Sequence, residues 1–91
     1  PAYASVQNAI GQACLALARA GKDKDESAVL AFDGAMAFCH VIVFSEAFAE
    51  EHAAAYSGAA QCFSILKDDA KTAQLKDTLK LTYGDAFPGV R

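Results

Sequence analysis

The side chains best suited to bind a metal or haem lie in the middle of the chain and are His40, His52, Cys39, Cys62 and Glu51. Two ligands on one helix face must be three or four residues apart, but Cys39 and His40 are adjacent, as are Glu51 and His52. A carboxylate-bridged di-metal bundle would need a glutamate three residues before His52, where an alanine stands. We therefore expect no metal or other cofactor and interpret both histidines as structural.

The serine, cysteine and carboxylate side chains do not form a recognisable catalytic site either. No serine or cysteine lies in a Gly-x-Ser-x-Gly motif, and the chain has no glycine-rich phosphate loop. Glu46, Glu50 and Glu51 lie among alanines, which cannot drive two carboxyl pKa values apart as acid–base catalysis requires. Asp33 is the lone acid in the apolar stretch 28–44, so it must find a donor, face water or lie at an interface. We predict that the chain is not an enzyme.

The overall charge argues against nucleic acid as a partner. Eight Lys and Arg against eleven Asp and Glu give a net charge of −3, whereas a phosphate-binding surface needs clustered cations. Several lysines gather within 67–80, but aspartates are interleaved with them. The cysteines Cys14, Cys39 and Cys62 form no CxxC pair, so we expect reduced, buried thiols in a cytoplasmic protein.

Length and composition favour one domain, residues 1–91, built from helices. The chain is long enough for a single core, and much of its 54% hydrophobic content is alanine, the best helix former. Apolar periodicity predicts a first helix over 2–20. The stripe that we expect to face the core comprises Tyr3, Val6, Ile10, Ala13, Cys14 and Leu17. We expect Gly21 to end this helix in a left-handed conformation and Asp23 to cap the next one.

The stretch from Ala28 to Phe44 is apolar around nearly its whole circumference and predicts a central helix. One alternative is a hairpin with strands at 28–32 and 37–44 around Asp33-Gly34. We favour the helix because neither flank alternates apolar with polar residues and its alanines prefer helix. The other alternative is a membrane span. A helix that crosses a bilayer needs about 20 apolar residues, which is more than this stretch has, and placing Asp33 in lipid would cost free energy. We expect no membrane partner.

Two further helices complete the predicted fold. We expect the third to be capped by Ser45, with an apolar stripe made of Phe48, His52, Ala55, Ala59, Cys62 and Leu66. The fourth is expected to be capped by Asp68 or Asp69 and to end at Gly84. Four helices with short connections predict an all-α protein, a small antiparallel helical bundle.

Surplus apolar surface is the main indication of function. One side of the second helix carries Val29, Phe32, Met36 and Val43, and another side carries Leu30, Ala37, Val41 and Phe44. A bundle core normally covers only one face of each helix, so the other face needs a partner. We predict a non-enzymatic protein–protein interaction module, acting as regulator, adaptor or inhibitor. We also predict a homodimer or higher oligomer formed through the second and third helices.

The candidate interface residues are Phe44, Phe48, Val41 and Tyr56. Phe44 and Phe48 are four residues apart, so they form an aromatic anchor if the helices run on through Ser45, and a weaker one if the chain turns there. The alternative function is a small ligand carrier, with a haem, metal or lipid enclosed between helices beside His40 and Cys39. The two functions differ in one simple observable, because a bound haem absorbs visible light.

Overall fold

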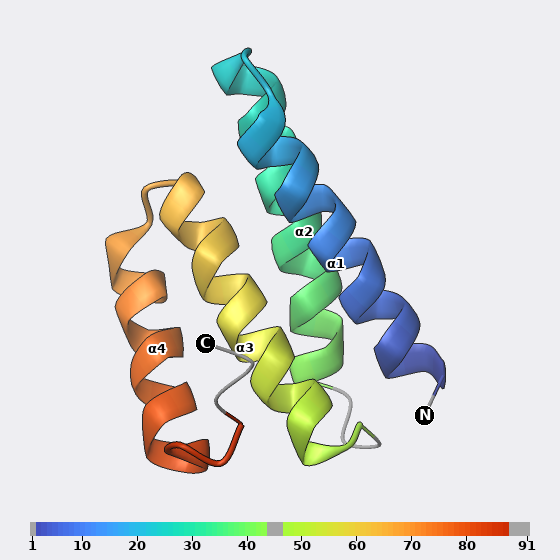
Figure 1. Cartoon of the computed structure of the whole chain (residues 1–91). Helices are drawn as coiled ribbons and strands as arrows, with labels where there is room; N and C mark the ends of the chain where they lie inside the picture. Colours follow the sequence, from blue (N-terminus) through green and yellow to red (C-terminus); the bar gives the residue numbers. More distant parts are fainter. Residues whose placement is uncertain (1, 44–46, 88–91) are drawn as a thin grey trace.

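A computed structural model describes residues 2–43 and 47–87. They form four helices, α1 (Ala2–Ala20), α2 (Lys24–Val43), α3 (Ala49–Ile65) and α4 (Asp69–Tyr83), as Figure 1 shows. No strand occurs within these two segments, which confirms the predicted all-α fold. The hairpin alternative for 28–44 is wrong in its described part, because α2 runs without interruption through Asp33 and Gly34.

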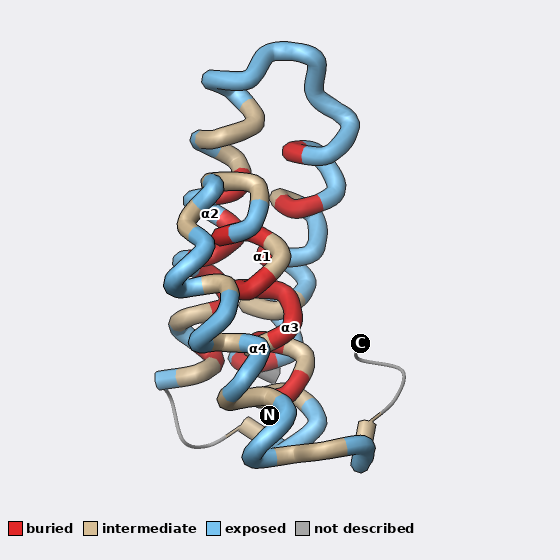
Figure 2. Tube along the Cα trace, turned by 90° about the vertical axis from the view of Figure 1, so that its left-hand side faces the viewer, coloured by how far each residue is buried: buried red, intermediate tan, exposed pale blue. Residues whose placement is uncertain are grey.

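The helices are not packed equally. In the described chain α1, α2 and α3 all pack against one another, whereas α4 packs against α3 alone. Figure 1 shows α4 at the outer side of α3, and Figure 2 shows that the buried positions follow the inner sides of α1, α2 and α3. No residue of α4 is fully buried. The bundle therefore consists of three helices that share a core and a fourth helix that packs against the outside of α3.

The centre of the core is the ring of Phe38, which is fully buried between two glycines. A Cβ atom added to Gly11 on α1 would lie 2.6 Å from the ring, and one added to Gly58 on α3 would lie 2.3 Å from it. Atoms cannot approach this closely without displacing one another, so any larger residue at either position must move the ring. The two glycines thus form a slot for Phe38.

Small residues also bring the helix backbones together beside this slot. A Cβ atom on Gly34 would lie 3.1 Å from both Cys14 Cβ and Cys62 Sγ, and 3.3 Å from the Gly11 carbonyl oxygen. The positions buried most completely on α2 and α3 include the alanines Ala31, Ala35, Ala53, Ala55 and Ala59. The alanine content therefore serves close helix packing as well as helix formation.

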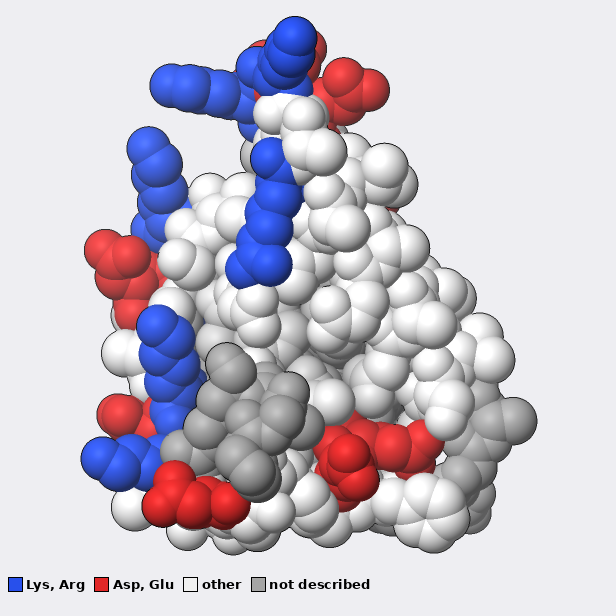
Figure 3. Space-filling view, viewed as in Figure 1, with Lys and Arg blue, Asp and Glu red and all other residues white. Residues whose placement is uncertain are grey.

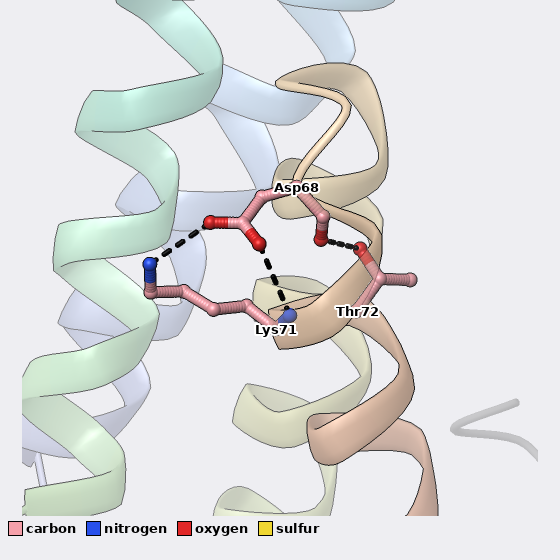
Figure 4. Close-up of polar contacts among 3 residues, drawn as sticks. All are labelled: Asp68, Lys71 and Thr72. Atoms are coloured by element: carbon pink, nitrogen blue, oxygen red, sulfur yellow. Dashed lines mark hydrogen bonds and ion pairs between the residues drawn. The ribbon is translucent and has the colours of Figure 1, made fainter.

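Side-chain caps fix the start of α2 and of α4. Asp23 Oδ1 accepts a hydrogen bond from the Asp25 backbone N–H at 2.9 Å, which confirms it as the cap of α2. Asp68 accepts from the backbone N–H of Lys71 at 3.1 Å and from its Nζ at 2.9 Å (Figure 4). The bonds from the backbone satisfy N–H groups that have no partner inside the helix. The side-chain and backbone hydrogen bonds from Lys71 also lower the pKa of the Asp68 carboxyl.

The start of α3 differs from the prediction. The helix begins at Ala49 after Phe48, whose backbone N–H donates to Glu51 Oε1 at 2.8 Å, whereas Ser45 lies outside the described residues. Glu51, three residues after Phe48, thus binds the backbone N–H of the residue that precedes the helix. The backbone of Phe48 is extended, with φ −67° and ψ 157°, so Phe48 does not lie on a helix continuous with α2.

The helix ends also differ in part from the prediction. Gly84 ends α4 with a φ of 54°, as expected. The predicted left-handed conformation of Gly21 is wrong, because Gly21 is not among the described residues with positive φ. It falls on Lys67, with a φ of 60°, after α3. The Lys67 N–H donates to the Ser64 carbonyl and the Asp68 N–H to the Phe63 carbonyl, the bonds of a Schellman motif.

Replacing Lys67 by glycine should stabilise the protein. A side chain in the left-handed region is strained, whereas glycine adopts it freely, so we expect Lys67→Gly to raise the free energy of unfolding by about 0.5–1 kcal/mol. Urea denaturation monitored by circular dichroism measures this change. Lys67→Ala is the matched control, because it removes the same charge and keeps the Cβ. Equal stability of the two variants would contradict the left-handed conformation of Lys67.

Candidate interaction surface

The outer side of α1 exposes large apolar side chains. Tyr3, Val6, Ile10 and Leu17 are 49%, 54%, 45% and 58% exposed. The prediction that this stripe faces the core is therefore wrong for these four residues and for Ala13, which is also exposed, whereas Cys14 is half-buried and lies beside Gly34. The core instead receives a different stripe, made of Ala4, Gly11, Leu15 and Ala18. The reason is steric, because only a glycine leaves room for the ring of Phe38 on this side.

The outer side of α2 is apolar as well. Val29, Phe32, Met36 and Val43 are all exposed, whereas Ala31, Gly34, Ala35, Phe38 and Val41 on the other side are buried. The expectation that the core covers only one of the two apolar sides of this helix is confirmed. The exposed side is the one that begins with Val29.

These eight side chains define what we call the outer face. Its members on α1 are Tyr3, Val6, Ile10 and Leu17, and those on α2 are Val29, Phe32, Met36 and Val43. The intervals between successive members are three, four and seven residues on both helices, which places each set on one helical stripe. Tyr3 Oη and His40 Nδ1 are 3.3 Å apart, so the two helices meet at this edge.

The outer face carries almost no charge. Residues 3–17 contain no Lys, Arg, Asp or Glu, and residues 28–43 contain only Asp33, which is exposed. Figure 3 shows a broad uncharged area over α1, with the Lys and Arg side chains gathered at the top and along the side of α4. An exposed apolar area of this kind on a small protein marks an interaction site.

The predicted interface residues that the structure describes do not form one exposed surface. Val41 is fully buried in the core, so it is not a surface residue, and Tyr56 is half-buried with its ring centre 6.3 Å from that of Tyr83. Phe48 is 68% exposed, but it precedes α3 rather than lying within it. Phe44 lies outside the described residues.

A signal in the sequence could have identified the core-facing side of α1. Positions 4, 8, 11, 15 and 18 alternate intervals of four and three residues, the spacing of helices that pack closely together. They hold alanine, asparagine, glycine, leucine and alanine, so a hydrophobicity count ranks them below the stripe that begins at Tyr3. Small residue size, not hydrophobicity, was the relevant signal.

Polar contacts fix α1 against α3 along a different edge. Ser5 Oγ donates to Glu51 Oε2 at 2.7 Å, and Asn8 Nδ2 donates to the Glu51 carbonyl oxygen at 3.1 Å. The hydrogen bonds from the Phe48 backbone and from Ser5 hold the pKa of the Glu51 carboxyl below its usual value. Glu51, a candidate metal ligand by residue type, is thus engaged in holding two helices together.

The region proposed for a bound ligand is dispersed. His40 is exposed and lies next to Tyr3 at the edge of the outer face, and Met36 is exposed on that face. Cys39 is half-buried against the core cluster, and burial raises the pKa of its thiol. Within residues 2–43 and 47–87 no three His, Cys, Asp or Glu side chains are grouped so as to hold a metal ion.

Helix α2 alone among the described helices is long and apolar enough to cross a membrane. The core helix of a soluble protein passes the same test. A third of its most apolar window is buried inside the bundle.

The three thiols should differ in reactivity. Cys62 is fully buried and its pKa is raised to about 11, chiefly by burial, whereas Cys14 and Cys39 are half-buried. At a pH of about 8 only about one Cys62 thiol in a thousand is ionised, and the thiolate is the reactive form. We expect Cys62 to be the slowest to react with a maleimide in native protein, as followed by peptide mass spectrometry. Labelling of Cys62 as fast as in urea-unfolded protein would contradict this.

Comparison with protein-family models, with curated proteins and with solved structures finds no match to this chain.

Proposed function

We propose that this chain is a non-enzymatic helical protein–protein interaction module that self-associates through the outer face. It would act by docking on another protein, as a regulator, adaptor or inhibitor, in the cytoplasm, where its free thiols stay reduced. The observation that carries the proposal is the exposure of eight large apolar side chains on two neighbouring helices. A chain of 91 residues buries little surface by itself, and association commonly compensates for this.

A second copy is the occupant that suits this face best. The face is apolar and nearly uncharged, so it complements another apolar face rather than a charged one. A two-fold dimer uses the same patch on both copies. The apolar stripes on α1 and α2 have the same spacing. In a symmetric dimer, α1 of each copy can therefore pack on α2 of the other copy.

The expected affinity is moderate. Each side chain of the outer face is roughly half exposed, so burying its remaining surface contributes about 1 kcal/mol, and the face as a whole on the order of 10 kcal/mol. Association itself costs about 4–15 kcal/mol in lost freedom of motion. We therefore expect a dissociation constant in the micromolar range or weaker.

Sedimentation of the unmodified protein tests the proposal. The mass should rise above the 9.5 kDa of one chain between micromolar and near-millimolar concentration. A single species of monomer mass over that whole range would overturn self-association. The outer face would then need a different apolar partner.

A further inference from the structure

A second surface, separate from the outer face, lies over α3 and α4. It is a groove of about 450 Å³ lined by Ser57, Ala60, Gln61, Lys76, Leu79 and Lys80. Figure 3 shows Lys and Arg side chains along the side formed by α4 and another in the middle of this view. The groove thus combines cations with a polar and an apolar wall.

The polar wall of the groove is held in place by hydrogen bonds. Arg19 Nη2 donates to Gln61 Oε1 at 2.6 Å, which fixes the orientation of the amide. Gln61 Nε2 then donates to the Ser57 carbonyl oxygen at 3.3 Å and to Ser57 Oγ at 3.1 Å. Because Ser57 Oγ accepts in this contact, its own proton can be donated into the groove. Ser57 is a buried polar residue, at 8% exposure.

The two lysines of the groove form no ion pair with any residue that the structure describes. Lys76 and Lys80 are four residues apart on α4, which places both on one side of the helix. The structure of residues 2–43 and 47–87 shows an ion pair for Lys71 but none for Lys76 or Lys80. Arg19, bound to Gln61, adds a third positive charge near the polar wall. Asp77, which lies between the two lysines in sequence, does not line the groove, so the field inside the groove favours an anion.

We infer that this groove binds a small organic anion, a carboxylate or phosphate group carried on a short apolar body. The anionic group would lie between the Lys76 and Lys80 ammonium groups and accept the proton of Ser57 Oγ. Leu79 and Ala60 would pack against the apolar body. The inference stands apart from self-association, because the groove shares no residue with the outer face.

Titration of the full chain with hexanoate, followed by ¹⁵N-resolved NMR, tests the inference. We expect saturable shifts of the backbone amides of Ser57, Gln61 and Lys80. The double variant Lys76→Gln, Lys80→Gln should bind at least about tenfold more weakly, because both cations are lost. Lys67→Gln is the matched control, since it removes one lysine outside the groove and should leave the affinity unchanged.

Two further probes separate the contributions of charge and apolar contact. Hexanamide, which lacks the charge, should bind at least tenfold more weakly than hexanoate. Inorganic phosphate, which lacks the apolar body, should shift the same amides but with lower affinity than hexanoate. The inference is overturned if hexanoate shifts amides elsewhere or none, if hexanamide binds as well, or if the double variant binds as tightly as the unmodified chain.

Discussion

Gly58→Ala should destabilise the protein by about 2–3 kcal/mol, although alanine is the better helix former. Helix propensity alone predicts stabilisation by about 1 kcal/mol. The added Cβ would lie 2.3 Å from the buried ring of Phe38. The free energy lost by overpacking the core is larger than the free energy gained from the higher helix propensity of alanine. The free energy of unfolding, measured in urea, decides between the two signs. Gly11→Ala should act in the same direction, since its Cβ would lie 2.6 Å from the same ring.

A double-mutant cycle is the control for this prediction. Phe38→Leu removes the ring, so Gly58→Ala in that background should cost at least about 1 kcal/mol less than in the unmodified protein. Phe38→Ala alone should cost about 3–5 kcal/mol, as expected for a fully buried phenylalanine. Stabilisation of the unmodified protein by Gly58→Ala would show that the glycine slot does not determine the packing.

Phe32→Asp should weaken self-association at least about a hundredfold while leaving the helices intact. Phe32 is half exposed on the outer face, so a charge there costs little in the monomer and much in a dry interface. Sedimentation gives the dissociation constant, and circular dichroism gives the helical content. Ile10→Asp should have a similar effect through α1.

Leu81→Asp is the matched control for these variants. Leu81 is 86% exposed on α4, away from the outer face, so its replacement should not change the dissociation constant. Phe48→Asp distinguishes the outer face from an interface formed by α2 and α3, because Phe48 lies at the start of α3. A larger effect of Phe48→Asp than of Phe32→Asp would contradict the assignment of the interface to α1 and α2.

The number of helices and several of their ends could be predicted from the sequence. These features depend on local chemistry: alanine content, the caps Asp23 and Asp68, and the terminal Gly84. The start of α3 could not be predicted in this way. It depends on Glu51, whose carboxylate binds both the Phe48 backbone and Ser5 on another helix.

The orientation of α1 is set by a contact between distant parts of the chain. Its larger apolar residues suggested one face, but the ring of Phe38 on α2 needs Gly11 opposite it, and this turns Tyr3 and Ile10 outward. The same contact decides which side of α2 is buried. That α2 has a surplus apolar side was therefore predictable, whereas the pairing of that side with the stripe on α1 required the packed structure.

The most direct test of the central claim is a search for contacts between two copies of the chain. In a mixture of ¹³C-labelled and unlabelled protein, isotope-filtered NMR detects only contacts between copies. We expect such contacts from the methyl groups of Val6, Ile10 and Val29 on the outer face. Intermolecular contacts confined to α4, or none at near-millimolar concentration, would contradict self-association through α1 and α2.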